Sequence, residues 1–438
     1  MKKIKISMIG AGSGAFSLGF IKDICMNRNL EGSTVSFMDI NPERLDAVHA
    51  ISTRYAKEQG IDLKLEKTTN RRDSLKDADF VVSSALAAGH DRLKKGFHLA
   101  LKHGFRFPGS YHILYGESFW TNFYQLRLME SITEDILDVC PNAWHIMVMN
   151  PVAAGTTHIL RNYPAAKMVG LCHGYIELNT IAGDLGLSPA EVNYEVAGIN
   201  HFIWLTKIFG KGEDKSEELF NLSAYSKNPR KKLMQMLGAH PIGDTADWTG
   251  ALWPWWNNMA DSGLEFWKDD PDEFSHGWDA YFNFVDRTAK DMIRHSNDEE
   301  MMVSELFSSE MNEESIVPLL ESLALDKPGV FVVNLLNSRE FVPGIPKDFA
   351  VEIPAYCSKL GVQGIETKEL PKPIRLHLLR DRVVPIEMEL EAYTTGNKAL
   401  LIQLIMMDRF CTSKEQAEAF LDELLSLPFH EEMRNHYN

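Results

Sequence analysis

The stretch IKISMIGAGSGAF, residues 4–16, decides the fold of this chain. Its first half, Ile4 to Ile9, is rich in β-branched residues and predicts a short buried strand. Glycines follow at once, and Phe16 to Met26 then has the pattern of a helix. A strand that passes through a glycine turn into a helix is typical of dinucleotide-binding proteins. We therefore expect a cofactor site at this turn.

The small residues of the turn follow the pattern G-x-G-x-x-A. Gly10 permits the tight turn, Gly12 lets the backbone approach a pyrophosphate, and Ala15 permits close packing of helix on strand. The helix N-terminus adds backbone N–H groups for an anion. We predict that Gly10, Gly12, Ser13 and Phe16 bind the cofactor. A tight turn without a cofactor can use the same glycines. The prediction of a cofactor site therefore depends on the strands and polar residues that follow.

Further strand-like runs alternate with helical patterns. They are Thr34 to Met38, Ala78 to Ser84, Trp144 to Met149 and Lys167 to Leu171. The alternation predicts an α/β fold with a Rossmann-like, doubly wound parallel sheet. After Ala197 it fades into longer helices and aromatic loops. We predict an NAD-binding domain over residues 1–195. An interwoven α+β domain over residues 196–438 would bind substrate and metal and make oligomer contacts.

Polar residues at the ends of these strands extend the cofactor site. Asp39 ends the second strand, where a carboxylate can accept hydrogen bonds from the adenosine ribose, which favours NAD over NADP. Arg44 instead favours NADP, because its side chain can reach a 2′-phosphate. Ala85 and Asn150 follow later strands, at the edge where such sheets bind ligands. We assign all four residues to the cofactor.

Composition narrows the class of partner. With 45% hydrophobic and 24% charged residues among 438, the chain is typical of a globular protein with a large core. Its net charge of −16 argues against nucleic acid and anionic membranes as partners. No apolar run approaches the roughly 20 residues that cross a bilayer. Five scattered cysteines favour thiols over disulfides, so we expect a cytoplasmic protein that acts on small molecules.

A second group of residues has the chemistry of a metal site. Cys172-His173 follows the fifth predicted strand, and Asn200-His201 lies further along the chain. A thiolate and an imidazole are transition-metal ligands, and a metal beside a nicotinamide indicates redox chemistry on a polyol. Taken alone, each residue is more readily a buried thiol or a core histidine, and only the residues together make a metal site an equal alternative. Both interpretations stay open from the residues alone.

Two later segments are also ambiguous. The tryptophan-rich segment Trp248 to Trp256 suits the packing of a domain interface and equally a stacking wall for a sugar ring. His240 to Thr245 has ordinary turn chemistry. Its sequence, HPIGDT, becomes informative only through a resemblance.

In this order the motifs resemble those of glycoside hydrolase family 4, the NAD- and metal-dependent glycosidases. The resemblance runs through GAGS, ADFVVSSA, MNP, GLCHG, VAGINHFIWL, PIGDT, MELEAY and the terminal LPFHEEMRNHY. The Cys-His-Gly segment is similar to the α-glucosidase and α-glucuronidase branch, whereas the phospho-glycosidase branches carry Cys-Asn or Cys-Asp. The nearest likeness is thus an enzyme that hydrolyses α-glycosides with NAD and Mn²⁺.

The likeness also implies a site and a mechanism. The implied residues are the Mn²⁺ ligands Cys172 and His201, the sugar-binding Asn150, His173 and Asn200, and the catalytic Asp244 and His173, with Asp244 the base. NAD would take a hydride from C3 of the sugar, which acidifies the proton on C2. Deprotonation, elimination of the aglycone, addition of water and return of the hydride follow, so NAD is not consumed. A homodimer or homotetramer is typical of the family.

Departures from the branch keep alternatives open. Asp247 stands where the branch has an arginine, and residues 105–120 (FRFPGSYHILYGESFW) are unfamiliar. An α-glucuronidase, an α-galacturonidase or another family 4 α-glycosidase is therefore an alternative. An anionic sugar would need Arg92, Arg106 or His90 to balance Asp247. A lactate- or malate-type NAD-dependent dehydrogenase and an inactive NAD-binding sensor are the alternatives from other classes.

Overall fold

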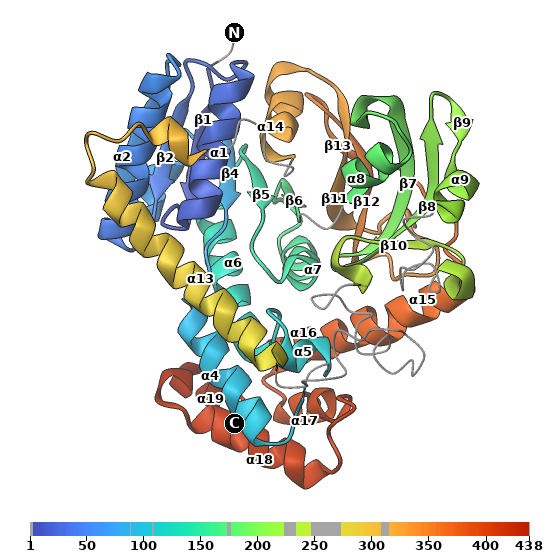
Figure 1. The fold of residues 1–438 in the computed structure, drawn as a ribbon. Helices are drawn as coiled ribbons and strands as arrows, with labels where there is room; N and C mark the ends of the chain where they lie inside the picture. The colour runs from blue at the N-terminus through green and yellow to red at the C-terminus, as the bar shows by residue number, and fades with distance from the viewer. Residues whose placement is uncertain are drawn as a thin grey trace.

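The computed structural model describes residues 3–87, 89–106, 109–172, 177–222, 234–246, 273–307 and 315–437. Its first six strands are β1 (Lys5–Ile9), β2 (Thr34–Met38), β3 (Lys64–Thr68), β4 (Phe80–Ser83), β5 (Trp144–Met147) and β6 (Met168–Gly170). They pair in parallel in the order β3-β2-β1-β4-β5-β6, which is the order of a Rossmann fold (Figure 1). The predicted fold class is confirmed.

The strand β3 is the one member of this parallel set that the sequence analysis missed. Its sequence, KLEKT, is charged and only partly buried. Because β3 pairs with β2 alone, it is an edge strand, and charged side chains are common on exposed edges. The other five strands are mostly apolar and largely buried, a pattern that a sequence reveals directly.

The same sheet continues with antiparallel strands. These are β7 (Val192–Ile199), β8 (Phe202–Gly210), β9 (Glu213–Asp214), β10 (His240–Ile242), β11 (Gly329–Leu336), β12 (Ala350–Ser358) and β13 (Gly361–Gly364). β11 pairs with β6 through Asn334 and Gly170, and the order continues β11-β12-β7-β8-β10. The two halves are therefore interwoven through one sheet of 13 described strands. The boundary predicted after residue 195 falls within β7, and the division of roles between the halves stays a prediction.

Helices cover both faces of the parallel half. The helices of this half are α1 (Gly14–Asn27), α2 (Pro42–Glu58), α3 (Arg71–Leu75), α4 (Gly89–Lys102), α5 (Tyr111–Leu114), α6 (Phe119–Val139) and α7 (Val152–Asn162). Two further helices, α8 (Glu177–Asp184) and α9 (Ser216–Asn221), pack with the antiparallel strands β7 and β8. One apolar core joins α1, α2 and a later helix, α14 (Ile316–Leu325), to the sheet, and a second joins α6 and α7. Local signals fix the boundaries: Asn41 caps α2 by accepting a hydrogen bond from Arg44 N at 3.0 Å, and Pro42 begins the helix.

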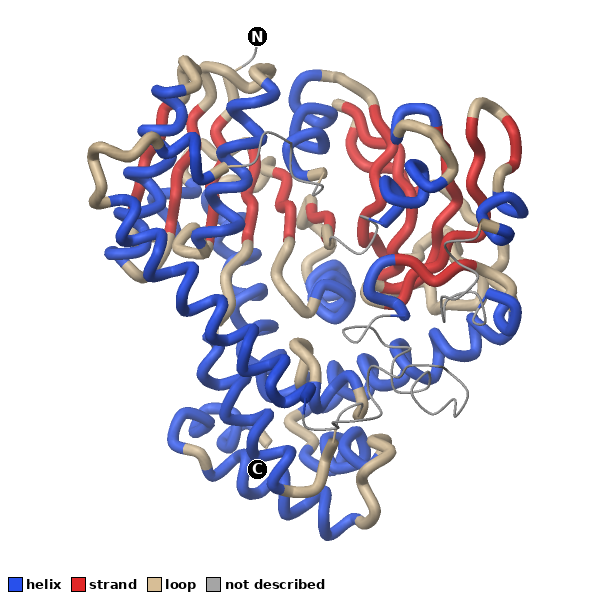
Figure 2. Tube along the Cα trace, in the orientation of Figure 1, coloured by secondary structure: helices blue, strands red, loops and turns tan. Residues whose placement is uncertain are grey.

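The C-terminal half adds a long helix and a helical cluster. The helices are α13 (Glu273–Ser296), α15 (Lys372–Leu378), α16 (Val384–Thr395), α17 (Lys398–Met406), α18 (Lys414–Ser426) and α19 (Glu431–His436). In Figure 1, α13 crosses the molecule diagonally in yellow, from α2 down to the region of α4 and α5. Met292 of α13 packs against Gly14 in the first turn of α1. Figure 2 shows how helix-rich the lower part is. Among the described helices, none is long and apolar enough to span a membrane.

Candidate functional site

The glycine turn after β1 adopts the shape that its sequence predicts. Gly10 has a φ of +87°, a conformation that favours glycine, and its amide donates to Met38 O at 2.9 Å. The Gly12 amide donates to Asp39 Oδ2 at 2.7 Å. A Cβ at Gly12 would lie 2.7 Å from the Asp39 carboxylate, and one at Gly10 would lie 2.5 Å from Ala85 N. The structure thus brings together Gly10, Gly12, Asp39 and Ala85.

Other residues assigned to the cofactor lie around this turn. Ser13 is exposed and Phe16 is half-buried at the start of α1. Arg44 lies in the first turn of α2, and its charge adds to the effect of burial in lowering the pKa of His90 at the start of α4. Ala15 is exposed, so its predicted role in packing the helix on the strand is wrong.

Cys172 and His201 approach each other although they come from different strands. Cys172 follows β6 and is half-buried, whereas His201 is buried in the two-residue turn that joins β7 to β8. The distance between Cys172 Sγ and His201 Nε2 is 3.8 Å. His201 has a φ of +61°, a strained conformation for a residue with a side chain. Strain of this kind is common where a side chain must be aimed precisely at a ligand.

A buried ion pair that the sequence analysis missed lies beside His201. Glu117 Oε1 is 3.6 Å from His201 Nε2, and Arg382 Nη2 is 3.0 Å from Glu117 Oε2. Arg382 also lies over the ring of Tyr111, with its Cζ 4.3 Å from the ring centroid, and Tyr111 contacts the His201 ring. Arg382 belongs to a π-helical turn, Leu379–Val383, a rare geometry that often accompanies functional sites.

The unfamiliar segment 105–120 is thus part of the candidate site, since it contributes Tyr111 and Glu117. No local sequence pattern predicts the Glu117–Arg382 ion pair, because the two residues lie 265 residues apart in the chain. The useful signal in the sequence was the departure itself: an acidic residue and a tyrosine stood in a stretch that otherwise had no assigned role.

The turn that carries Asp244 is fixed from two sides. The 3-10 turn Gly243–Ala246 follows β10. Gly243 N donates to Glu177 Oε2 at 2.9 Å, and Glu177 begins the helix that follows the Cys172 segment. On the other side, Thr245 Oγ1 accepts a hydrogen bond from Ile203 N at 2.7 Å, and Ile203 lies two residues after His201. The Asp244 backbone is therefore held between the segments of both predicted metal ligands.

Several predicted residues cannot be placed in this arrangement. His173, Asp247 and the segment Trp248 to Trp256 lie outside the described residues, as does the side chain of Asp244. Asn150 is exposed between β5 and α7, at the predicted edge of the sheet. Asn200 is fully buried, and its Nδ2 donates to Glu352 Oε2 at 3.1 Å.

Arg92, His90 and Arg106 are the three residues that could balance the charge of an anionic sugar. Arg92 and His90 pack against aromatic rings, and Arg106 is exposed to solvent. The Arg92 guanidinium lies 3.9 Å from the ring centroid of Tyr124. His90 packs against the rings of Tyr281 and Phe282, and burial lowers its pKa. The side chain of Arg106 is exposed.

Cys172 differs from the other four cysteines in its surroundings. All five are described, and none is joined in a disulfide, as predicted. Burial raises the pKa of Cys25 and of Cys357 to about 12 and that of Cys140 to about 11, and it also raises the pKa of Cys411. Only Cys172 among them has a histidine nitrogen near its sulfur in the described structure. Within that structure, no group of three or more His, Cys, Asp or Glu side chains is arranged to hold a metal ion.

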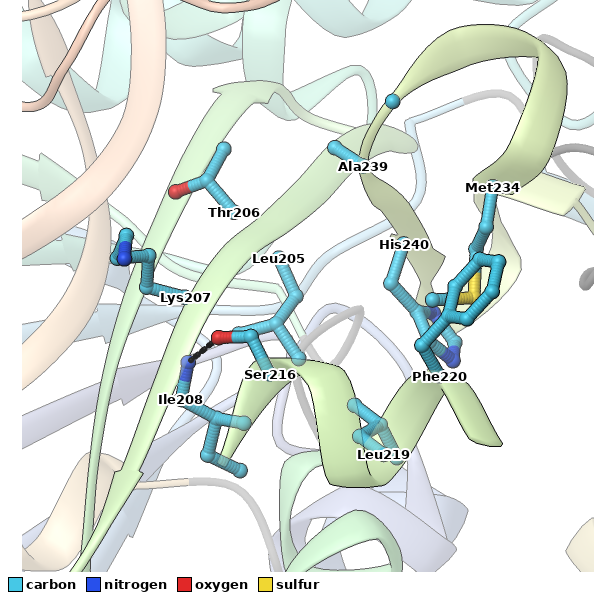
Figure 3. A pocket seen from close by; sticks show the side chains of 11 residues that line it. Leu205, Thr206, Lys207, Ile208, Ser216, Leu219, Phe220, Met234, Ala239 and His240 are labelled. Carbon is cyan, nitrogen blue, oxygen red and sulfur yellow. Dashed lines mark hydrogen bonds between the residues drawn. The ribbon is translucent and has the colours of Figure 1, made fainter. Parts of the chain in front are cut away.

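A separate cavity of about 210 Å³ lies between β8, α9 and β10 (Figure 3). Its lining is largely apolar, with Leu205, Ile208, Leu219 and Phe220 among its residues. None of the residues assigned to cofactor, metal or sugar lines it. We therefore do not assign this cavity to the candidate site.

Comparison with known proteins identifies the family of the chain. The profile of the family described as "Family 4 glycosyl hydrolase" matches residues 5–186, and the profile of its C-terminal domain matches residues 196–411. An α-glucosidase of Erwinia rhapontici is 25% identical, over 96% of this chain and 97% of that protein. An α-galactosidase of Bacillus subtilis (strain 168) is 22% identical, over 97% and 96%.

A similar solved structure is a 6-phospho-α-glucosidase from gut microorganisms in complex with NAD and Mn²⁺. It has a TM-score of 0.77 at 18% identity and covers 97% of this chain and 98% of that chain. At this identity the likeness concerns the fold alone, whereas the family profiles cover most of the sequence. The chain belongs to family 4 of the glycosyl hydrolases.

Proposed function

We propose that the protein hydrolyses α-glycosides of a neutral hexose, with glucose the first candidate, by reversible oxidation of the sugar. NAD and Mn²⁺ would be its cofactors. The observation that carries the proposal is the 3.8 Å approach of Cys172 Sγ to His201 Nε2 at the carboxyl edge of a Rossmann sheet. Family membership supports a glycosidase, and the site supports its cofactor dependence.

The Cys172–His201 pair fits a manganese ion that also binds substrate. The 3.8 Å between Cys172 Sγ and His201 Nε2 suits two ligands of one cation. A thiolate and an imidazole both bind divalent transition metals. Two protein ligands leave positions for sugar oxygens, as catalytic metal sites require. Glu117, 3.6 Å from His201 Nε2, adds negative charge next to this position.

The glycine turn fits a dinucleotide. Gly10 and Gly12 leave space where a Cβ would collide with Ala85 and Asp39, and the N-terminus of α1 presents backbone N–H groups. Asp39 is half-buried at the end of β2, where the ribose of NAD lies in this fold. These features support NAD as the bound nucleotide.

The chain's own residues would then divide the work. When bound, NAD would supply a reversible hydride acceptor and Mn²⁺ an electrophile that acidifies the sugar. Asp244 would remove the proton from C2, Asn150 and Asn200 would orient sugar hydroxyls, and His173 would lie at the reacting ring. The two anchors of the Gly243–Ala246 turn would keep Asp244 at a fixed distance from the metal ligands.

The charges of the described residues around the site favour a neutral sugar. Arg382 is neutralised by Glu117, Arg92 is stacked on Tyr124, and the pKa of His90 is lowered. A uronic acid or a phosphorylated sugar would need an available cation, and Arg382, the guanidinium beside His201 in the described structure, is already paired with Glu117. We propose further that the protein acts as a homodimer or homotetramer in the cytoplasm, where its thiols would stay reduced.

The test is hydrolysis of an aryl α-glucoside by reduced protein with NAD and Mn²⁺ in D₂O, with NMR of the released sugar. Deuterium at C2, together with loss of turnover when either cofactor is omitted, is the expected result. Hydrolysis without exchange would defeat the mechanism. Net formation of NADH would identify a dehydrogenase, and saturable NAD binding without turnover of any glycoside would identify a sensor.

A further inference from the structure

The turn between β7 and β8 is unusually constrained. Ile199 and Phe202 pair directly, so only Asn200 and His201 form the loop. Gly198, just before it, has no room for a side chain, because a Cβ there would collide with the Phe202 carbonyl. His201 at the end of the loop has a positive φ. Such a loop needs an external contact to hold its side chains in one arrangement.

Glu352 provides that contact from a distant part of the chain. It lies on β12, is fully buried, and pairs in register with Gly198 of β7. Its Oε2 accepts a hydrogen bond from Asn200 Nδ2 at 3.1 Å, across 152 residues of sequence. A buried carboxylate is costly to keep in a protein interior unless its partners compensate for the lost water, so its presence here calls for a reason.

The contact fixes the direction of the Asn200 amide. A carboxylate only accepts hydrogen bonds, so the NH₂ group of Asn200 must face Glu352 and the amide oxygen must face away. That oxygen, Oδ1, is buried and has no hydrogen-bond partner among the described residues. A buried acceptor without a partner is uncommon and points to a donor from outside the described residues, such as a bound ligand.

We propose that Glu352 is a positioning residue: it orients Asn200 so that Oδ1 accepts a hydrogen bond from a hydroxyl of the bound sugar. This inference rests on the proposed function, because it takes the ligand to be a sugar held beside His201. A hydroxyl whose oxygen faces a cation donates its proton outward, so an acceptor is the group that the sugar needs there.

The test uses Glu352→Gln, which preserves size. Two facing amides can pair either way, so part of the Asn200 population turns its NH₂ group toward the sugar. The Kd of glucose, measured by calorimetry on protein loaded with NAD and Mn²⁺, is expected to rise about tenfold, and KM to rise with little change in kcat. The Kd of NAD is expected to stay unchanged.

The matched control is Glu195→Gln in the same hairpin. Glu195 Oε1 also accepts a side-chain hydrogen bond, from Thr206 Oγ1 at 2.7 Å, but it lies toward the other end of β7. This variant is expected to bind glucose like the parent. A parent-like Kd and KM in Glu352→Gln, or the same rise in both variants, would overturn the inference.

A double variant, Glu352→Gln with Asn200→Asp, covers the case in which the single variant folds poorly. The glutamine amide can donate to the introduced carboxylate, whose second oxygen restores the acceptor. Glucose affinity is expected to recover, and failure to recover would count against the inference. Glucose binding by the parent without C2 exchange would defeat the proposed function alone, whereas no glucose binding at all would defeat both.

Discussion

The Thr245 hydroxyl exchanges two hydrogen bonds with the backbone of Ile203. It accepts from Ile203 N at 2.7 Å and donates to Ile203 O at 2.9 Å. Thr245→Val keeps the shape but leaves both backbone groups without this partner, at a cost of about 1–3 kcal/mol. Because the turn also carries Asp244, we expect kcat to fall more than the affinity for NAD. Steady-state kinetics and calorimetry would measure the two effects.

Thr245→Ser is the control, because it retains the hydroxyl and is expected to retain most of the activity. If Thr245→Val loses stability but keeps the kcat of the parent, the anchor does not serve Asp244.

The two glycines of the cofactor turn should differ in how they respond to alanine. A Cβ at Gly10 would meet the backbone of Ala85 at 2.5 Å, and its φ of +87° is strained for alanine. A Cβ at Gly12 would meet the Asp39 side chain at 2.7 Å, which can move away. We expect Gly10→Ala to lower the melting temperature clearly. Gly12→Ala should mainly weaken NAD binding, because it displaces the carboxylate that we propose to face the ribose.

Thermal unfolding and NAD titration of the two variants would separate these effects. Gly60→Ala tests the contribution of φ alone, since Gly60 has a φ of +64° and a Cβ there would have nothing within 4 Å. Unchanged NAD affinity in Gly12→Ala would show that the turn does not bind the dinucleotide.

The parallel half of the fold could be predicted from the sequence because its buried strands are short, mostly apolar segments. Thr34–Met38 was predicted to the residue, whereas the strand predicted at Ala78 to Ser84 is shorter, Phe80–Ser83. The polar edge strand Lys64–Thr68 carried no such signal. The antiparallel half was not predicted strand by strand, because β11 and β12 join the sheet only after a long excursion of the chain.

The candidate site likewise contains residues that the sequence predicts and residues that it does not. Motifs located Gly10, Gly12 and the Cys172–His201 pair, because local spacing or family likeness marks them. Glu352, 152 residues from its partner Asn200, was missed. Such contacts depend on tertiary packing, and a single sequence has no period or spacing that records them.

Cys172→Ser should separate the proposed metal site from the proposed nucleotide site. A serine hydroxyl stays protonated at neutral pH and is a poor substitute for a thiolate ligand. We expect the Kd of Mn²⁺ to rise more than about tenfold and turnover to be lost, while NAD binding stays close to that of the parent. Electron paramagnetic resonance of free Mn²⁺ would measure the first effect.

Cys411→Ser is a matched control, since Cys411 is also half-buried but donates to Ser413 O at 3.4 Å. Parallel loss of NAD and Mn²⁺ binding in Cys172→Ser would instead assign Cys172 a structural role.

The buried imidazole of His145 should make the protein sensitive to mild acid. Burial lowers the pKa of His145 from the usual 6.5 to about 4, and its Nε2 is 2.7 Å from Ser83 Oγ. Between pH 6.5 and 4, His145 is protonated in the unfolded chain but stays neutral in the folded protein. The free energy of unfolding should therefore fall with decreasing pH, by about 1.4 kcal/mol per pH unit from this group.

His145→Gln should lose less stability per pH unit than the parent, whereas His98→Gln, at an exposed position, should follow the parent. Melting temperatures between pH 7.5 and 5 would measure these slopes, and equal slopes in His145→Gln and the parent would mean that folding does not lower the pKa of His145.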